Sequence, residues 1–176
     1  MKKILLVCLL SLFSLQARAD ITNSELFKTI NDRLSYMEDV ALFKAKNHLP
    51  IEDIQREAVV IEKATLSAGE RGVDPESVKD FFNAQIAVAK AIQYRYRADL
   101  LSRPCSRQPL DLNKEVRPAL IRLGDQLMVQ MVAFCKRHGK YQPTSFAEFD
   151  KAITIKYVTT ADKQLLLNAL LKVKLQ

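Results

Sequence analysis

Two basic residues lie where one face of a helix should be apolar. Positions 26, 30, 33, 37, 40 and 44 follow helical spacing and read Leu, Ile, Arg, Met, Val and Lys. Eleven residues of helix would place Arg33 and Lys44 about 16 Å apart and within about 20° of one direction. A buried cation is costly unless an anion pairs with it. We therefore expect carboxylates near them, either from another helix or from a small ligand that lies between them over Met37 and Val40. The alternative is that both side chains bury their stems and keep their charges in water.

Further basic residues follow in the next segments. Arg56 lies next to Glu57 and three residues after Asp53, so one cation is flanked by two carboxylates. The same arrangement also suits an ordinary surface ion pair. Arg117 lies in the first turn of a later predicted helix, where free backbone amides also favour an anion.

Two glutamines, Gln85 and Gln93, interrupt the apolar face of a third segment. Each is either a ligand of a bound molecule or a partner for nearby backbone groups. Together with the four basic residues and two carboxylates, they describe a pocket for a small dianion. The set contains no nucleophile, so a reaction here would proceed by positioning the substrate and stabilising the charge that develops on it.

The elements that position these residues are all predicted to be helices. The chain of 176 residues has only four glycines and six prolines, and no long alternation of apolar and polar residues favours strands. We predict one domain, an all-α bundle of about six helices with a loop at 102–113. The predicted helices span about 22–48, 51–71, 75–101, 115–137, 146–157 and 161–174, with Ser145 and Thr160 as caps of the last two.

The N-terminus has the features of a secretory signal. Lys2 and Lys3 precede the apolar run 4–15, and residues 17–19 read Ala-Arg-Ala. We predict a signal peptide at 1–19 and a mature domain at 20–176 that is periplasmic or secreted, with no membrane attachment after cleavage. Cleavage changes the formal charge from 27 − 20 = +7 to 24 − 20 = +4, and this weak positive charge without a basic cluster argues against nucleic-acid binding.

Cysteine and histidine are scarce in the mature chain. Export permits a disulfide, so Cys105 and Cys135 are the candidate pair; two separate thiols are the alternative. The only histidines are His48 and His138, and no Cys or His has ligand spacing. We therefore predict neither a metal site nor an organic cofactor.

The order of these residues closely resembles that of secreted chorismate mutases, the gamma branch of the helical AroQ-type family. The similarity covers about residues 22–100 and extends more weakly into the helix that begins near Arg117. The matching motifs are Asn31-Asp32-Arg33-Leu34, Val40-Ala41-Leu42-Phe43-Lys44, Leu49-Pro50-Ile51-Glu52-Asp53, Arg56-Glu57, Gln85-Ile86 and Ala91-Ile92-Gln93-Tyr94.

The resemblance implies an isomerase of aromatic amino acid biosynthesis in the shikimate pathway. Such an enzyme converts chorismate to prephenate by a pericyclic rearrangement, needs no cofactor and commonly forms a homodimer. Arg33, Arg56 and Arg117 are implied to hold the two substrate carboxylates. Lys44 is implied to donate to the ether oxygen, on which negative charge grows.

The remaining implied roles belong to neutral and acidic groups. Gln93 corresponds to a second donor to the ether oxygen, Glu57 to the acceptor for the ring hydroxyl, and Asp53 to its support. Two residues depart from the family pattern: Ala89, in the substrate site, replaces a hydroxyl-bearing or polar residue of many relatives, and Val60 replaces a glutamine of some. A catalytically silent, exported helical module that binds an anionic metabolite or a protein partner remains the alternative.

Overall fold

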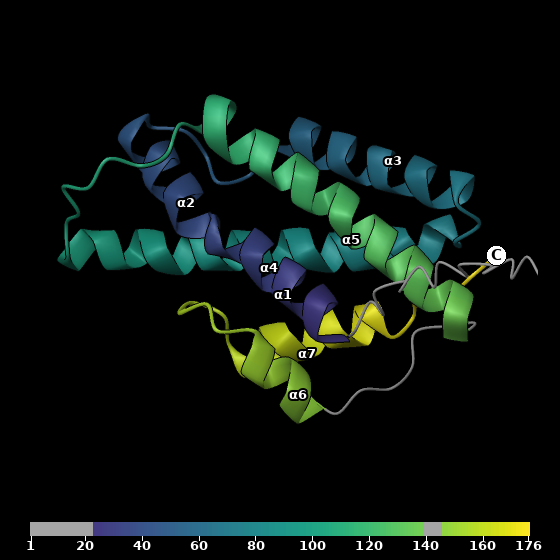
Figure 1. The fold of residues 1–176 in the computed structure, drawn as a ribbon. Helices are drawn as coiled ribbons and strands as arrows, with labels where there is room; N and C mark the ends of the chain where they lie inside the picture. The colour runs from purple at the N-terminus through teal and green to yellow at the C-terminus, as the bar shows by residue number, and fades with distance from the viewer. Residues whose placement is uncertain (1–22, 139–145) are drawn as a thin grey trace, which may run out of the picture.

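The computed structural model describes residues 23–138 and 146–176. The predicted signal peptide and the predicted cap Ser145 lie outside this part of the chain. The described residues form α1 (Asn23–Ser35), α2 (Met37–Lys46), α3 (Ile54–Glu70), α4 (Pro75–Ser102), the π-helical turn η1 (Leu112–Val116), α5 (Arg117–His138), α6 (Phe146–Ala152) and α7 (Thr160–Leu170) (Figure 1). The all-α prediction is confirmed, and the predicted count of six helices holds if α1 and α2 count as one.

The first predicted helix is interrupted at Tyr36. The hydroxyl of Ser35 donates to the carbonyl of Asp32, a local bond that competes with regular helical bonding. Tyr36 itself has helical angles (φ −75°, ψ −11°), and its carbonyl still accepts from the amide of Val40. As a result α2 continues close to the direction of α1 (Figure 1); α2 packs on α4, and α1 packs on α5.

The helix ends follow local capping chemistry. Asp74 caps α4 by accepting from the amide of Glu76, and Pro75 occupies the first helical turn, where no amide donor is needed. The cap of α7 is Thr159 rather than the predicted Thr160, because the Thr159 side chain accepts from the amide of Asp162 and completes a capping box. The shift of one residue is set by which hydroxyl faces the third helical amide.

The α3–α4 turn depends on Gly72, which has φ +75°. The amide of Gly72 donates to the carbonyl of Gly69, and the amide of Val73 donates to that of Ala68, which is the pattern of a helix-ending Schellman turn. An isolated bridge then joins Val73 to Leu175 near the C-terminus.

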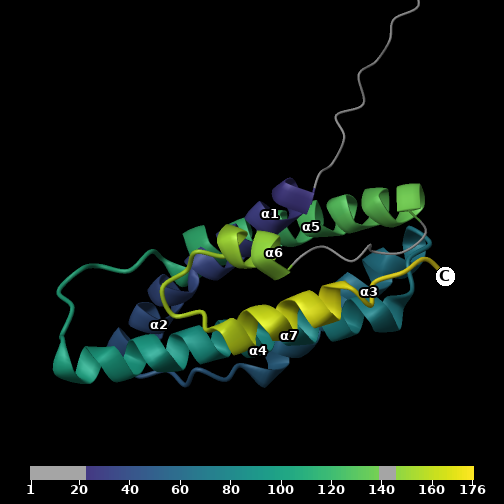
Figure 2. The ribbon, with the colours of Figure 1, turned by 90° about the horizontal axis from the view of Figure 1, so that it is seen from below.

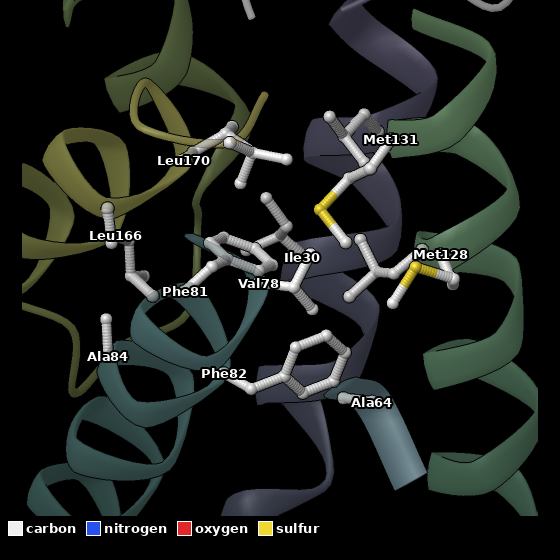
Figure 3. Packing of buried hydrophobic residues seen from close by; sticks show 14 of the residues in the cluster. Ile30, Ala64, Val78, Phe81, Phe82, Ala84, Met128, Met131, Leu166 and Leu170 are labelled. Carbon is white, nitrogen blue, oxygen red and sulfur yellow. The ribbon is translucent and has the colours of Figure 1, made fainter. Parts of the chain in front are cut away.

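The core lies where α1, α4 and α5 meet, and α6 and α7 cover it from the other side (Figure 2). Figure 3 shows Ile30 of α1, Phe81 and Phe82 of α4, and Met131 of α5 directed toward one another, beside Leu166 of α7. All five side chains are buried. Among the described helices, none has the length and apolar composition required to cross a membrane.

In contrast, α3 buries only Ala64 and Ala68 fully. It packs on α4 and beside α5 (Figure 1). Because its buried residues are small, α3 contributes little to the core and instead forms a wall of the cavity described next.

Candidate active site

A cavity of about 220 Å³ lies among α1, α2, α3, α4 and α5. Every residue that the sequence assigned to substrate binding or catalysis lines this cavity. These residues are Arg33, Lys44, Asp53, Arg56, Glu57, Ala89, Gln93 and Arg117. The fold therefore gathers positions that are up to 84 residues apart in the sequence, from Arg33 to Arg117, around one space.

Arg33 is held by three neutral groups. Its Nε donates to Oε1 of Gln85 at 2.9 Å, and its Nη1 donates to the carbonyl of Leu120 at 2.7 Å. Its guanidinium carbon lies 5.6 Å from the centroid of the Phe82 ring. Burial lowers the pKa of Arg33 to about 10, which leaves the guanidinium charged at neutral pH.

Gly124 of α5 makes room for Arg33. A Cβ atom at position 124 would lie 3.2 Å from Nη1 of Arg33. Gly124 also lies one helical turn after Leu120, whose carbonyl binds the same nitrogen. The absence of a side chain at this position therefore allows α5 to approach the buried guanidinium.

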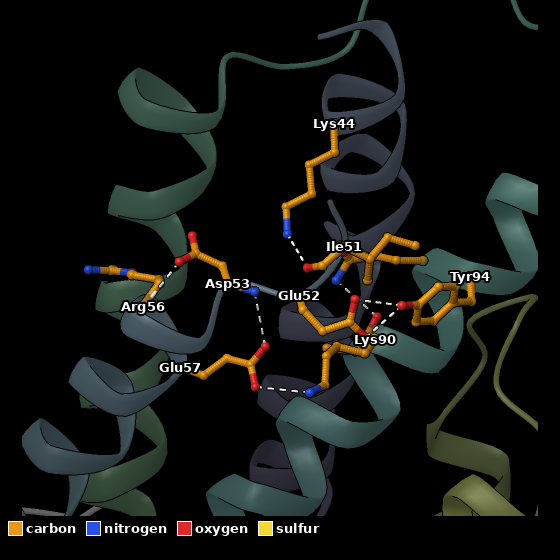
Figure 4. A network of polar contacts seen from close by, with 10 residues as sticks. Lys44, Ile51, Glu52, Asp53, Arg56, Glu57, Lys90 and Tyr94 are labelled. Carbon is orange, nitrogen blue, oxygen red and sulfur yellow. Dashed lines mark hydrogen bonds and ion pairs between the residues drawn. The ribbon is translucent and has the colours of Figure 1, made fainter. Parts of the chain in front are cut away.

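Lys44 is the most deeply buried lysine of the cavity, with 8% of its surface exposed. Its Nζ donates to the carbonyl of Ile51 at 2.5 Å (Figure 4). The chain reverses between them at His48, which has φ 54° and closes a Schellman turn in which the amide of Leu49 donates to the Lys44 carbonyl. Burial lowers the pKa of Lys44, and the nearby carboxylate of Asp53 counteracts part of this shift.

The first turn of α3 carries three of the expected residues. Asp53 caps the helix by accepting from the amide of Arg56 at 3.1 Å, and its own amide donates to Oε1 of Glu57 at 3.3 Å. Figure 4 shows Glu57 turned from this cap toward Lys90, with its second oxygen 2.9 Å from the lysine Nζ. Within the described residues, no hydrogen bond or ion pair engages the guanidinium of Arg56. The carboxylates of Asp53 and Glu57 are therefore hydrogen-bonded to backbone amides, whereas the guanidinium N–H groups of Arg56 remain available for a ligand.

Arg117 closes the cavity from the start of α5. Its Nη1 donates to the side-chain carbonyl of Asn113 at 2.5 Å, and its Nη2 lies 3.4 Å from Oδ2 of Asp53. The preceding turn η1 is fixed by Asp111, whose carboxylate accepts from the amides of Asn113 and Lys114. The side chain of Arg117 is about one-third exposed, at 36%, which places it at the rim.

The cavity face of α4 contributes two glutamines, one alanine and a lysine. Gln93 Nε2 donates to the carbonyl of Ala89 at 3.1 Å and lies 3.8 Å from the sulfur of Met37. Its Oε1 is buried and has no hydrogen-bond partner among the described residues. Gln85 accepts from Arg33 through Oε1, and its buried Nε2 finds no acceptor in residues 23–138 and 146–176. Lys90 is a residue that sequence reasoning missed, because its ion pair with Glu57 joins two helices and leaves no mark in the sequence.

The charge balance of the lining is positive. It contains six basic residues and three acidic ones, and the rest is mainly apolar. The basic residues are Arg33, Lys44, Arg56, Lys63, Lys90 and Arg117, and the acidic ones are Asp53, Glu57 and Asp125. The cavity therefore suits a compact molecule with two negative charges and an apolar body.

Two positions where this chain departs from the family pattern also lie here. Ala89 and Val60 both line the cavity with apolar side chains. Neither supplies the hydrogen bond that a polar residue would give. Within the described residues, no group of three Asp, Glu, Cys or His side chains has the geometry of a metal site.

The predicted disulfide between Cys105 and Cys135 is wrong in this structure, because both are free thiols. Cys105 packs beside Tyr96 in the small cluster near the end of α4. Cys135 lies in the last turns of α5, fully buried in the main core, and its sulfur is 3.8 Å from the carbonyl of Val173. The two cysteines thus belong to separate apolar clusters, and the burial of Cys135 raises its pKa to about 11.

Comparison with known proteins identifies the family of this arrangement. Residues 15–94 match the family model described as chorismate mutase type II. A secreted chorismate mutase of Yersinia pestis is 41% identical over 150 residues, which cover 84% of this chain and 79% of the relative. A monofunctional chorismate mutase of Enterobacter agglomerans is 32% identical over 163 residues, which cover 90% of this chain and 87% of the relative.

A solved structure gives the same result. The crystal structure of secreted chorismate mutase from Yersinia pestis matches with a TM-score of 0.80 and 40% sequence identity. The match covers 86% of this chain and 98% of that chain.

Proposed function

Because this chain belongs to the chorismate mutase type II family, we propose that its cavity binds chorismate and rearranges it to prephenate. The chain is accordingly a chorismate mutase, an isomerase, rather than a silent binding module. The observation that supports this site is the gathering of all eight expected residues around one positively charged cavity.

Arg33, Arg56 and Arg117 are the proposed ligands of the two substrate carboxylates. Among the described residues, the guanidinium of Arg56 has no hydrogen-bond partner, and Arg117 donates to Asn113 and has one acidic contact, the 3.4 Å pair with Asp53. Arg33 has no acidic partner within the described residues. A planar guanidinium binds a carboxylate through two parallel hydrogen bonds, so these groups fix the orientation of the substrate as well as its charge.

Lys44 and Gln93 are the proposed donors to the ether oxygen. Lys44 has three N–H groups and donates one to Ile51, which leaves two for a ligand. Gln93 has one N–H on Ala89 and directs the other toward a methionine sulfur, a weak acceptor that an ether oxygen would replace. One preorganised donor contributes about 3 to 4 kcal/mol, and an acceleration at the low end of the enzymatic range requires about 8 kcal/mol. Two donors and restraint of the substrate in its compact conformer are therefore sufficient.

Glu57 is the proposed acceptor for the ring hydroxyl. Its oxygens already accept from the amide of Asp53 and from Lys90, and each carboxylate oxygen has a second lone pair. Asp53 supports this arrangement because it caps the same helical turn.

The proposal also includes export of the protein and its assembly into a homodimer. The predicted signal peptide and the Yersinia relative, which is named as secreted, both support action outside the cytoplasm. A homodimer is the expected assembly, by resemblance to the gamma branch.

The test is turnover of chorismate by the mature protein, followed as loss of its ultraviolet absorbance. We expect activity in the wild type and its near-complete loss in Lys44→Ala and Arg33→Ala proteins that remain folded by circular dichroism. Lys28→Ala, which removes an exposed lysine paired with Asp32, is the matched control and should remain active. An inert wild type, or fully active Lys44 and Arg33 variants, would refute the proposal.

A second measurement tests Gln93. A glutamine amide is neutral at all ordinary pH values, unlike a glutamate, which must be protonated to donate. We expect kcat to change little between pH 5 and pH 8. A steep fall across this interval would contradict the role of Gln93 as a donor.

A further inference from the structure

Arg33 and Arg117 are held in the cavity by different kinds of group. Arg117 contacts a carboxylate of Asp53, whereas Arg33 is bound by an amide oxygen, a backbone carbonyl and an aromatic ring. These groups fix the direction of the guanidinium without cancelling its charge. The charge is therefore fully available to an anionic ligand, at the cost of desolvation in the empty protein.

Gln85 is the side chain that makes this arrangement possible. It is 3% exposed, and its Oε1 accepts the Nε–H of Arg33 at 2.9 Å. The amide orientation follows from this contact, because the reverse orientation would direct an N–H group at another N–H group. The price is the buried Nε2 of Gln85, which has no acceptor among the described residues.

A glutamate at this position would remove that cost. It would have the same length, would accept from Arg33 through a stronger charged hydrogen bond and would leave no unpaired amide. It would also neutralise the cation on which carboxylate binding depends. The presence of an amide therefore favours ligand binding over the stability of the empty site.

We propose that Gln85 is a positioning residue that orients Arg33 through a neutral acceptor, so that the guanidinium keeps its charge for a substrate carboxylate. This inference rests on the proposed function. Gln85 acts through Arg33 and requires no contact with the reacting atoms.

The decisive variant is Gln85→Glu in the otherwise unchanged mature protein. We expect its thermal unfolding temperature to equal or exceed that of the wild type, because the buried arginine gains a counter-charge. We expect KM for chorismate to rise at least tenfold, the effect of losing one hydrogen bond between charged groups, with a smaller change in kcat. Calorimetry with prephenate, which shares the two carboxylates, should show the same loss of affinity without turnover.

A second variant removes the acceptor but keeps the site neutral. Gln85→Met should unfold at a lower temperature than the wild type and should raise KM severalfold, because Arg33 loses one of its two hydrogen bonds. If Gln85→Glu does not fold, this variant decides the question. The matched control is Gln130→Met. Gln130 of α5 is also buried and has an amide oxygen without a partner among the described residues, but it does not line the cavity. The KM of the Gln130→Met protein should therefore equal that of the wild type.

Wild-type KM in folded Gln85→Glu, or wild-type KM in Gln85→Met, would overturn the inference. Either result in an active wild type would leave the proposed function intact. An inactive wild type would instead refute the proposed function.

Discussion

Gly124→Ala should separate the stability of this protein from its affinity for substrate. The new Cβ would lie 3.2 Å from Nη1 of Arg33, closer than the usual contact distance of about 3.5 to 4.0 Å. Arg33 cannot move away freely, because Gln85 holds its Nε and the Phe82 ring lies against its face. We therefore expect the hydrogen bond from Nη1 to Leu120 to be displaced and the guanidinium to shift.

The substitution has two opposing effects on the free energy of unfolding. Replacing glycine by alanine inside a helix stabilises it by about 1 kcal/mol. A hydrogen bond to a charged group contributes about 1.5 to 3 kcal/mol, and its partial loss should offset that gain. We expect the free energy of unfolding to change by less than about 1 kcal/mol. Misplacing Arg33 should cost about 1.4 kcal/mol of substrate binding, which corresponds to a tenfold rise in KM.

Gly69→Ala is the matched control for this experiment. Among the described residues, Gly69 is the other glycine inside a helix. Its added Cβ would meet only Pro75 at an ordinary 3.7 Å, and Gly69 does not line the cavity. Denaturant unfolding and chorismate kinetics on both variants give the comparison. We expect Gly69→Ala to gain stability with unchanged KM. If Gly124→Ala shows the same result, Arg33 is not held at the place or in the role described here.

Three further predictions concern charged groups. Lys44→Met should lower kcat by about 10²- to 10³-fold. It should not lower the unfolding temperature, because burying the ammonium of Lys44 destabilises the wild type. Since burial lowers the pKa of Lys44, wild-type kcat/KM should fall at a pH below the ordinary lysine value of 10.5. An alkaline limb at or above that value would contradict this. Lys90→Met should raise KM because Glu57 loses its ion pair, whereas Lys28→Met should not; equal KM values would exclude a role for Lys90. Asp162→Asn should cost about 1 to 3 kcal/mol in urea unfolding at pH 7. Burial would raise the pKa of Asp162, but hydrogen bonds from Arg95 and Thr159 hold it below the ordinary aspartate value of 3.8. The stabilising contribution of Asp162 is therefore present above about pH 4 and is lost as the pH falls below 3.8. An equal loss at pH 3 and pH 7 would refute this assignment.

Helical spacing predicted most of the fold because the apolar faces are regular. The caps that are encoded by one residue type, such as Asp74 before Pro75, were also predictable. The break at Tyr36 was not, since it depends on a hydroxyl-to-carbonyl bond of Ser35 that an apolar pattern does not register. The cap of α7 was predicted one residue too late, at Thr160. Thr159 and Thr160 are adjacent, and the sequence does not show which hydroxyl faces the amide of Asp162.

The site was predictable to the extent that its residues break an apolar pattern. Arg33 and Lys44 do so on one predicted helix, and both line the cavity. Lys90 does not stand out in the sequence, because a lysine at the edge of a helix face resembles any solvated residue, and its ion pair to Glu57 joins two helices. The cysteines show the converse error. Export and an even count made a bridge reasonable, but Cys135 is buried in the main core, whereas Cys105 is partly buried against a separate apolar cluster.

The bridge between Val73 and Leu175 gives the last residues of the chain a remote influence. Gln176 donates to the carbonyl of Gly72, and Asp74 donates to that of Lys174, so the tail fastens the far end of α3. The helix runs 17 residues, about 25 Å, from this anchor to the end that carries Arg56 and Glu57, and it has few buried side chains of its own to hold it. Removing residues 174–176 should therefore allow α3 to move relative to α4 and α5. The first effect should be a higher KM for the substrate rather than a lower melting temperature.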